Sequence, residues 1–195
     1  MATKPRILGR RMAAETRIFR VEEIDLAFSN GNQRRFERIL GGRGSVLVVP
    51  MRDPETLLLT REYDAGLDRY ELGFPKGIID PGEDALQAAD RELREEVGHG
   101  ARDLRLLRTL SIAPGYIQHV THLVLARDLY ASPAEGDEPE PIEVVPWPLA
   151  DQAGLLARED FSEARSVAAL YLLRRFLDAQ SGISGMDVAA GDPLE

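Results

Sequence analysis

One segment, residues 77–98, constrains the fold more than any other part of the chain. It begins with a stretch that contains glycine and proline and continues into a Glu-rich run. Successive residues of a helix are rotated by roughly 100°, so Glu92, Glu95 and Glu96 fall within an arc of about 100°. The segment therefore predicts a loop followed by a helix with three carboxylates on one side.

The start of this helix is set by local sequence. Residues 77–82 contain Gly77, Pro81 and Gly82 and cannot form a regular helix, whereas Asp84, followed three residues later by Gln87, offers a capping box. An apolar stripe, centred roughly 110° from the carboxylates, consists of Leu86, Ala89, Leu93 and Val97. We therefore expect one face of the helix to pack on a core and the adjacent face to concentrate negative charge.

Three neighbouring carboxylates require a compensating positive charge. Like charges three or four residues apart destabilise an isolated helix. Oxygen ligands without nearby His or Cys favour Mg²⁺ or Mn²⁺ over zinc, and the chain contains no Cys. His119 and His122 lack further partners for a zinc site, so we interpret them as ordinary strand residues. The segment therefore predicts a site for Mg²⁺ or Mn²⁺.

The spacing resembles the signature of the Nudix hydrolases. That signature reads Gly-x5-Glu-x7-Arg-Glu-aliphatic-x-Glu-Glu-x-Gly-apolar, and the chain departs from it only at His99, which we expect to affect only packing. At average composition such a match arises by chance on the order of once in 10⁸ windows. The resemblance implies an α/β (α+β) fold, the Nudix α/β/α sandwich with a mixed sheet, and metal-dependent cleavage of a diphosphate.

The resemblance also implies roles for residues of the signature. Glu92 and Glu96 would ligate the metal, with Glu95 as a further or bridging ligand, and the backbone carbonyl of Lys76 would complete the inner shell. Arg91 is expected to hold the loop against the helix, and ion-pair packing without a role in catalysis is its alternative.

Four further segments resemble hydrolases of ADP compounds within this family. They are residues 61–63, 70–80, 110–116 and 135–141. The resemblance implies cleavage of ADP-ribose, diadenosine triphosphate and NADH to AMP and a second phosphorylated product. A homodimer is implied as well, in which an N-terminal extension packs across the partner and lines the substrate site.

Four residues are candidates for substrate binding. Pro114 and Tyr116 stand where the family carries markers for ADP-ribose and dinucleoside polyphosphate substrates, and Tyr116 could stack on adenine. An ordinary turn and simple packing are the respective alternatives. Lys76 and Arg61 could neutralise phosphate, and for Arg61 a structural ion pair at a strand end is equally expected.

The general base is expected on the acidic loop at residues 132–141, because related ADP-ribose hydrolases use a Glu on a loop after the signature helix. Glu138 is the first candidate and Glu140 the second. For each, a merely solvated acidic loop is the alternative. Glu95 is a further candidate base, since it need not serve as a metal ligand.

The chain divides into three predicted parts. Residues 1–44 would form an antiparallel β extension, residues 45–178 the Nudix domain, and residues 179–195 a disordered tail. Strands of the extension are expected over 17–24, 26–28 and 33–39, with a hairpin turn at 29–32. Further strands are expected over 45–50, 56–61, 104–110 and 120–126, and a helix over about 162–178 that buries Val167, Leu170, Leu173 and Leu177.

Composition narrows the functional classes. The chain of 195 residues is 44% hydrophobic and 29% charged, which is typical of a globular protein. A net charge of −9 argues against DNA or membrane-surface binding, whereas a small nucleotide can be held by a metal and local basic residues. No apolar run has the length of a signal peptide or membrane span, so we expect a cytoplasmic protein.

Three other functions match parts of the pattern. An isomerase of isopentenyl diphosphate on the same scaffold needs a catalytic Cys, which the chain lacks. A non-catalytic nucleotide sensor would typically carry an additional DNA-binding module and could tolerate lost carboxylates. A pyrophosphohydrolase of another nucleoside diphosphate or of RNA 5′ ends shares the chemistry, and the acidic net charge disfavours RNA. Hydrolysis of ADP compounds is therefore the favoured function.

Overall fold

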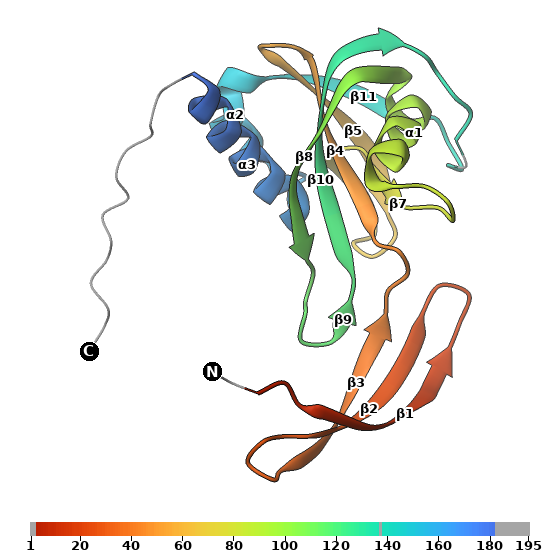
Figure 1. The fold of residues 1–195 in the computed structure, drawn as a ribbon. Helices are drawn as coiled ribbons and strands as arrows, with labels where there is room; N and C mark the ends of the chain where they lie inside the picture. The colour runs from red at the N-terminus through yellow and green to blue at the C-terminus, as the bar shows by residue number, and fades with distance from the viewer. Residues whose placement is uncertain (1–2, 137, 182–195) are drawn as a thin grey trace.

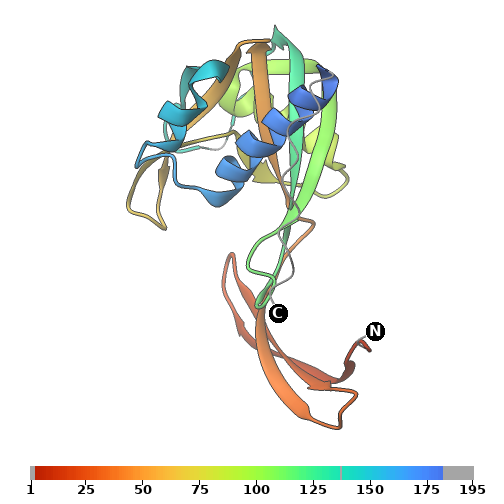
Figure 2. The same cartoon turned by 90° about the vertical axis from the view of Figure 1, so that its left-hand side faces the viewer.

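The computed structural model describes residues 3–136 and 138–181. A body of mixed sheet and helices forms the upper part of the molecule, and a unit of long strands from the N-terminal region projects below it (Figures 1 and 2). The projecting unit is the sheet β1-β2-β3-β9, and the body contains the sheet β11-β5-β4-β10-β8.

The strands of the projecting sheet are β1 (Arg6–Glu15), β2 (Arg20–Ala27), β3 (Gln33–Leu40) and β9 (Ile117–Gln118). Those of the body are β4 (Ser45–Asp53), β5 (Thr56–Asp64), β6 (Arg69–Gly73), β7 (Lys76–Ile78), β8 (His99–Ser111), β10 (Val120–Ala131) and β11 (Glu143–Pro148). The helices are α1 (Ala85–Val97), α2 (Gln152–Leu156) and α3 (Ala164–Gln180), with a 3₁₀ turn at Leu149–Asp151.

The central strand β4 shows why the body is a three-layer structure. It pairs in parallel with β10 and antiparallel with β5 and β7, so the sheet is mixed. Val46 and Val48 pack with α1 on one face, whereas Leu47 and Val49 pack with α3 on the other, and all four are fully buried. Because side chains alternate along a strand, one short apolar run supplies two cores. This arrangement confirms the predicted Nudix α/β/α sandwich.

Helix α1 begins as its sequence predicts and ends at Gly98. Asp84 accepts from the backbone N–H of Gln87 at 2.9 Å, and the Gln87 side chain accepts from the backbone N–H of Asp84 at 2.9 Å, which completes the capping box. Gly98 ends the helix in the left-handed region, with φ of 74°. Strand β8 follows directly, so the helix is held firmly at both ends.

The predicted apolar stripe of α1 is wrong at Leu86, which is 38% exposed. The buried face is rotated toward the carboxylates and includes Glu92 and Glu96. The physical reason is that α1 packs against β7 as well as against β4 and β8, so residues facing β7 are covered too. The sequence could not predict this contact, because β7 has only three residues and leaves no recognisable strand pattern.

The projecting sheet differs from the prediction in two respects. Strand β1 was not predicted, because its residues are almost all exposed and show no apolar alternation. Strand β2 continues through Asp25, where a break was expected, because Asp25 pairs there with Gly9 on β1 and with Arg35 on β3. The hairpin turn at residues 29–32 and strand β3 were predicted. The body contributes to this sheet as well, since β9 pairs in parallel with β3.

Several elements of the body were not predicted, namely β6, β7, β11 and α2, which are all short. Strands β8 and β10 are longer than expected. Helix α3 buries Leu170 and Leu173 as predicted, whereas the predicted Val167 and Leu177 are only partly buried, and it runs two residues into the predicted tail. The remainder of that tail, residues 182–195, lies outside the described residues. Within the described ranges, no helix is both long and apolar enough to cross a membrane.

The rotation of α1 can be tested by stability. Leu93 is fully buried against β4 and β10, so Leu93→Ala should lower the free energy of unfolding by about 2–5 kcal/mol. The matched variant Leu86→Ala should cost less than about 1 kcal/mol, because this leucine is partly exposed. Urea unfolding followed by circular dichroism would measure both, and equal losses would contradict the observed orientation of the helix.

Candidate active site

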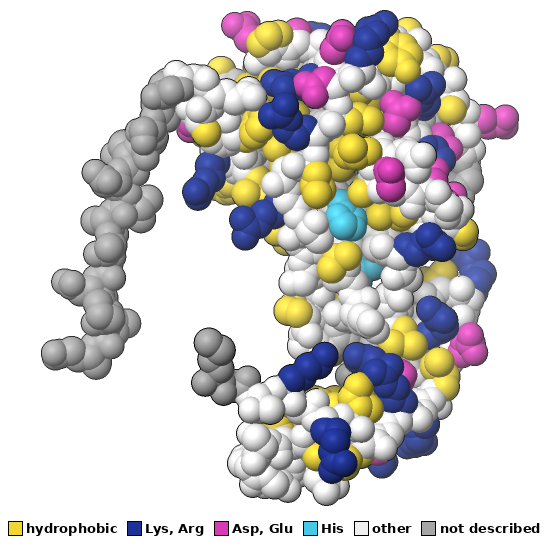
Figure 3. All heavy atoms as spheres, in the orientation of Figure 1, with side chains coloured by type: hydrophobic (Ala, Val, Ile, Leu, Met, Phe, Trp, Pro, Cys, Tyr) yellow, Lys and Arg dark blue, Asp and Glu magenta, His cyan; other side chains and the backbone are white. Residues whose placement is uncertain are grey.

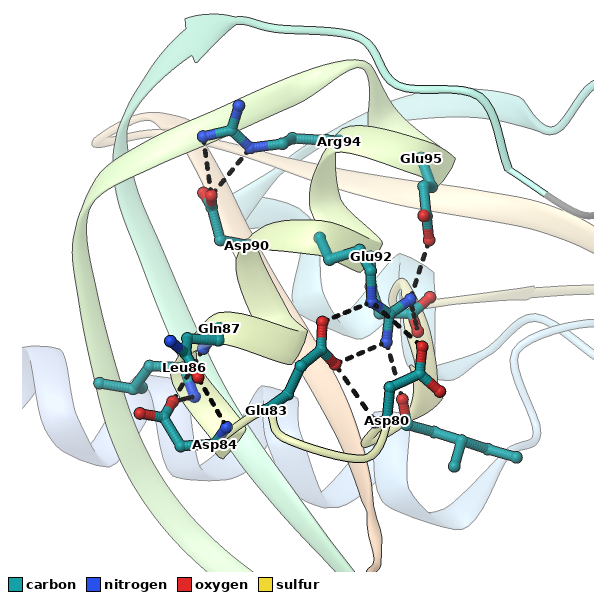
Figure 4. A network of polar contacts seen from close by, with 11 residues as sticks. Asp80, Glu83, Asp84, Leu86, Gln87, Asp90, Glu92, Arg94 and Glu95 are labelled. Carbon is teal, nitrogen blue, oxygen red and sulfur yellow. Dashed lines mark hydrogen bonds and ion pairs between the residues drawn. The ribbon is translucent and has the colours of Figure 1, made fainter.

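Arg91 connects the helix to the loop that precedes it. Its Nε donates to Glu83 at 2.9 Å and its Nη2 to the carbonyl of Ile78 at 2.8 Å. Its Nη1 donates to Glu92 at 2.8 Å and to Glu95 at 2.9 Å. Figure 4 shows Glu83, Glu92 and Glu95 converging on this side of the helix. One guanidinium therefore fixes the loop and partly neutralises two of the three signature carboxylates.

Glu92 and Glu96 are almost completely buried, at 6% and 5% exposure. Glu96 Oε1 accepts from the backbone N–H of Lys76 at 3.3 Å, whereas Oε2 is buried and has no hydrogen-bond partner among the described residues. The pKa of Glu96 is raised to about 9, first by burial and then by the nearby Glu92 and Glu62, against the lowering effect of Lys76. Burial also raises the pKa of Glu92, although Arg91 opposes this shift.

Gly77 occupies its position because Glu92 leaves no room for a side chain. A Cβ at this glycine would overlap the Glu92 carboxylate. Strand β7 therefore approaches the helix closely, and its backbone at Lys76 and Gly77 faces the buried carboxylates. The first glycine of the signature thus has a steric cause that its spacing alone did not reveal.

The donor set suits a hard divalent cation. Two carboxylates are buried together, one of their oxygens has no partner in the described part of the chain, and all the nearby donor atoms are oxygens. No group of three or more His, Asp or Glu side chains among the described residues has metal-binding geometry. Arg91 donates to both Glu92 and Glu95. Glu92 and Glu96 are the buried pair, and Glu96 has an oxygen without a hydrogen-bond partner in the described part of the chain, so these two residues could hold such a cation.

These carboxylates line one open cleft. Its lining consists of Glu62, Lys76–Ile78, Asp80, Arg91, Glu92, Glu95, Glu96, Glu135, Gly136 and Glu138. The cleft thus joins the helix, strand β7 and the acidic loop, which come from three separate parts of the chain. A diphosphate bound there would lie against the buried carboxylates with loop residues beside it.

Comparison with protein families gives a match for the N-terminal region and another for the body. A model of the NUDIX domain matches residues 42–170, and a model of the NudE-type Nudix hydrolase N-terminal domain matches residues 5–38. The chain belongs to the Nudix hydrolase family. The family assignment, the fold and the classification as a hydrolase made from the signature are thereby confirmed.

Two relatives place the chain within this family. It is 50% identical to the ADP compounds hydrolase NudE of Escherichia coli (strain K12), over 92% of this chain and 97% of that protein. It is 29% identical to the ADP-ribose pyrophosphatase of Bacillus subtilis (strain 168), over 82% of this chain and 87% of that protein. A crystal structure of an ADP compounds hydrolase matches with a TM-score of 0.87 at 50% identity, covering 92% of this chain and 97% of the other.

The two candidate bases of the acidic loop lie in different surroundings. Glu138 lines the carboxylate cleft of this Nudix hydrolase together with Glu95. Glu140 lies outside that lining and accepts a hydrogen bond from the Tyr70 hydroxyl at 2.6 Å. The structure therefore brings Glu138, but not Glu140, together with the signature carboxylates.

The two basic candidates also differ. Lys76 extends along the cleft, where its Nζ pairs with Glu62 at 2.9 Å. Arg61 donates to Asp160 at 2.6 Å and to Glu143 at 3.0 Å, so it makes the ion pair that was its structural alternative. It lines a neighbouring cavity instead of the cleft.

Pro114 and Tyr116 are not brought to the carboxylates within one chain. Both lie in the turn that leads into β9, and the carbonyl of Tyr116 accepts from the backbone N–H of Ile39 on β3 at 2.8 Å. Figure 1 shows β9 at the end of the body that meets the projecting sheet, away from α1. Tyr116 itself is 58% exposed.

Sequence reasoning gave no role to three residues at or beside the cleft. Glu62 lines the cleft, and Tyr63 and Tyr70 line the neighbouring cavity with Arg61. Their segments had been noted only for their family resemblance. Since β6 was not predicted, nothing in the sequence showed that Tyr63 on β5 faces Tyr70 across a strand pair.

Proposed function

We propose that this protein hydrolyses the diphosphate linkage of ADP compounds, namely ADP-ribose, diadenosine triphosphate and NADH, to AMP and a second phosphorylated product. One observation carries the proposal: the buried pair Glu92 and Glu96 lines an open cleft, and one Glu96 oxygen has no hydrogen-bond partner among the residues that the structure describes. The names of the relatives, an ADP compounds hydrolase and an ADP-ribose pyrophosphatase, support the substrate class.

The carboxylates would hold Mg²⁺ or Mn²⁺. Glu92 and Glu96 are its proposed ligands, the Lys76 carbonyl is a third and Glu95 a further one. Such an ion, when bound, supplies Lewis acidity and charge neutralisation to the diphosphate. Arg91 positions Glu92 and Glu95 through its two bonds from Nη1. The Lys76 ammonium could turn from Glu62 to a phosphate oxygen in the same cleft.

Glu138 is our proposed general base. Among the described residues its side chain makes no ion pair, whereas Glu95 is held by Arg91 and Glu140 by Tyr70. A water oxygen would attack one phosphorus and lose its proton to a carboxylate oxygen of Glu138. The bond from that phosphorus to the bridging oxygen breaks, and the bridging oxygen leaves with the other phosphate.

We further propose that the protein is a homodimer joined through its N-terminal region. Residues 1–44 contain ten Lys and Arg against five Asp and Glu, although the whole chain carries a net charge of −9. Figure 3 shows mostly basic side chains over the projecting unit, and both acidic and basic ones over the body. The unit also exposes large apolar side chains, namely Ile7, Leu8, Met12, Ile18, Phe19 and Phe36. Complementary charge and exposed apolar surface both favour packing against a second body.

The dimer can be tested by gel filtration with light scattering at micromolar concentration. The wild type should have twice the mass of the chain, and Phe36→Glu, which places a charge on the exposed apolar surface, should shift it toward the monomer. Glu55→Gln, on the exposed surface of the body, is the control. A monomeric wild type would remove this proposal.

The proposed reaction is tested by product analysis. With Mg²⁺ or Mn²⁺, the protein should release AMP from ADP-ribose, diadenosine triphosphate and NADH, and a chelator should stop it, because the buried carboxylates need a cation. Glu96→Gln should lower turnover by about 100-fold or more, with Glu55→Gln unchanged. Chromatography would identify the products. Absence of AMP from all three compounds would overturn the proposed substrate class.

The base assignment generates a separate expectation. Glu138→Gln should lower kcat by about 100-fold while leaving the metal concentration for half-maximal activity nearly unchanged, since this residue is not a proposed ligand. Glu140→Gln should have a much smaller effect because Glu140 lies outside the cleft. Steady-state kinetics with metal titration would compare them. A large loss confined to Glu140→Gln would move the base to that residue.

A further inference from the structure

A second cavity adjoins the carboxylate cleft. Glu62 and Glu138 line both, so the two spaces share a wall. The rest of the second cavity is formed by Arg61, Tyr63, Tyr70 and residues 139–143. A substrate whose diphosphate lies against Glu92 and Glu96 can therefore extend into the second cavity.

Two tyrosines give this cavity an aromatic wall. Tyr63 on β5 and Tyr70 on β6 are cross-strand partners, and their rings meet edge to face with centroids 5.5 Å apart. They are 44% and 49% exposed, yet each is held by its hydroxyl, which donates to Asp68 and to Glu140 respectively. An exposed ring in a fixed position is pre-organised for stacking, since little side-chain entropy remains to be lost.

The charge of the cavity indicates what it accepts. Glu62, Glu138, Glu140 and Glu143 line it, and its one basic lining residue, Arg61, already pairs with Glu143 and with Asp160. A further phosphate would be repelled by these carboxylates. A flat neutral or cationic ring would instead stack on the tyrosines without an electrostatic cost.

We propose that Tyr63 and Tyr70 form the subsite for the second nucleobase of dinucleotide substrates, the ring on the far side of the diphosphate from AMP. This inference rests on the proposed function. ADP-ribose carries a ribose but no base in that half, whereas diadenosine triphosphate carries an adenine there and NADH a dihydronicotinamide ring. The tyrosine pair therefore determines preference for dinucleotides without being required for cleavage itself.

The experiment compares substrates across tyrosine variants. In Tyr63→Leu and Tyr70→Leu, kcat/KM for diadenosine triphosphate and NADH should fall about tenfold, mainly through KM, the size expected for loss of one base–aromatic stack. The value for ADP-ribose should stay within about twofold. Tyr70→Phe keeps the ring and loses only the bond to Glu140 that holds it, so its loss should be clearly smaller than that of Tyr70→Leu. Tyr171→Leu, at an exposed tyrosine on α3, is the matched control.

Three outcomes would overturn the inference. No loss with either leucine variant would show that the rings do not bind substrate. Equal losses for ADP-ribose and the dinucleotides would assign the rings to the shared AMP half or to the loop. A loss in Tyr70→Phe as large as in Tyr70→Leu would assign the effect to the bond with Glu140. If all these variants still cleave ADP-ribose, the proposed function remains supported whatever the role of the tyrosines. A wild type that cleaves none of the three compounds would contradict both the proposed function and this inference.

Discussion

The contact of Arg91 with the loop and with two glutamates is the interaction on which the rest of the site depends. Its guanidinium bonds to Glu83 and to the Ile78 carbonyl on one side and to Glu92 and Glu95 on the other. Without it, the loop would lose these two bonds to α1, and Glu92 and Glu95 would lose the positive charge bonded to them. A planar fork with several donors can make these bonds at once, which a lysine could not do.

A second constraint is the close approach of β7 to α1. Gly77 lets the strand backbone pass against the Glu92 carboxylate, and the backbone N–H of Lys76 reaches Glu96. These contacts bury both carboxylates, which raises their pKa values. Burial of two like charges is unfavourable in itself, so these two residues lower the stability of the fold. A divalent cation bound between them would offset this repulsion. Stability and proposed catalysis are thus opposed at the same two residues.

The body and the projecting sheet play different parts. Strand β4 fixes the body by supplying buried side chains to both cores, and this holds α1 over one face of the sheet. The projecting sheet has few buried residues and meets the body mainly through β9. Its basic, partly apolar surface is therefore available for association, whereas the cleft is formed by the body alone.

The sequence by itself determined the helix, the cap at its start, the family and the position of the carboxylates, because these depend on local spacing and on hydrogen bonds between near neighbours. It also predicted the strands with long apolar runs. Tertiary structure alone decided which face of α1 is buried, since that depends on the three residues of β7. It also placed Glu138 in the cleft and Glu140 outside it, and it placed Tyr116 beside β9, away from α1. The pairing of Tyr63 with Tyr70 is of the same kind, since contacts between separate strands leave no periodic signal in either one.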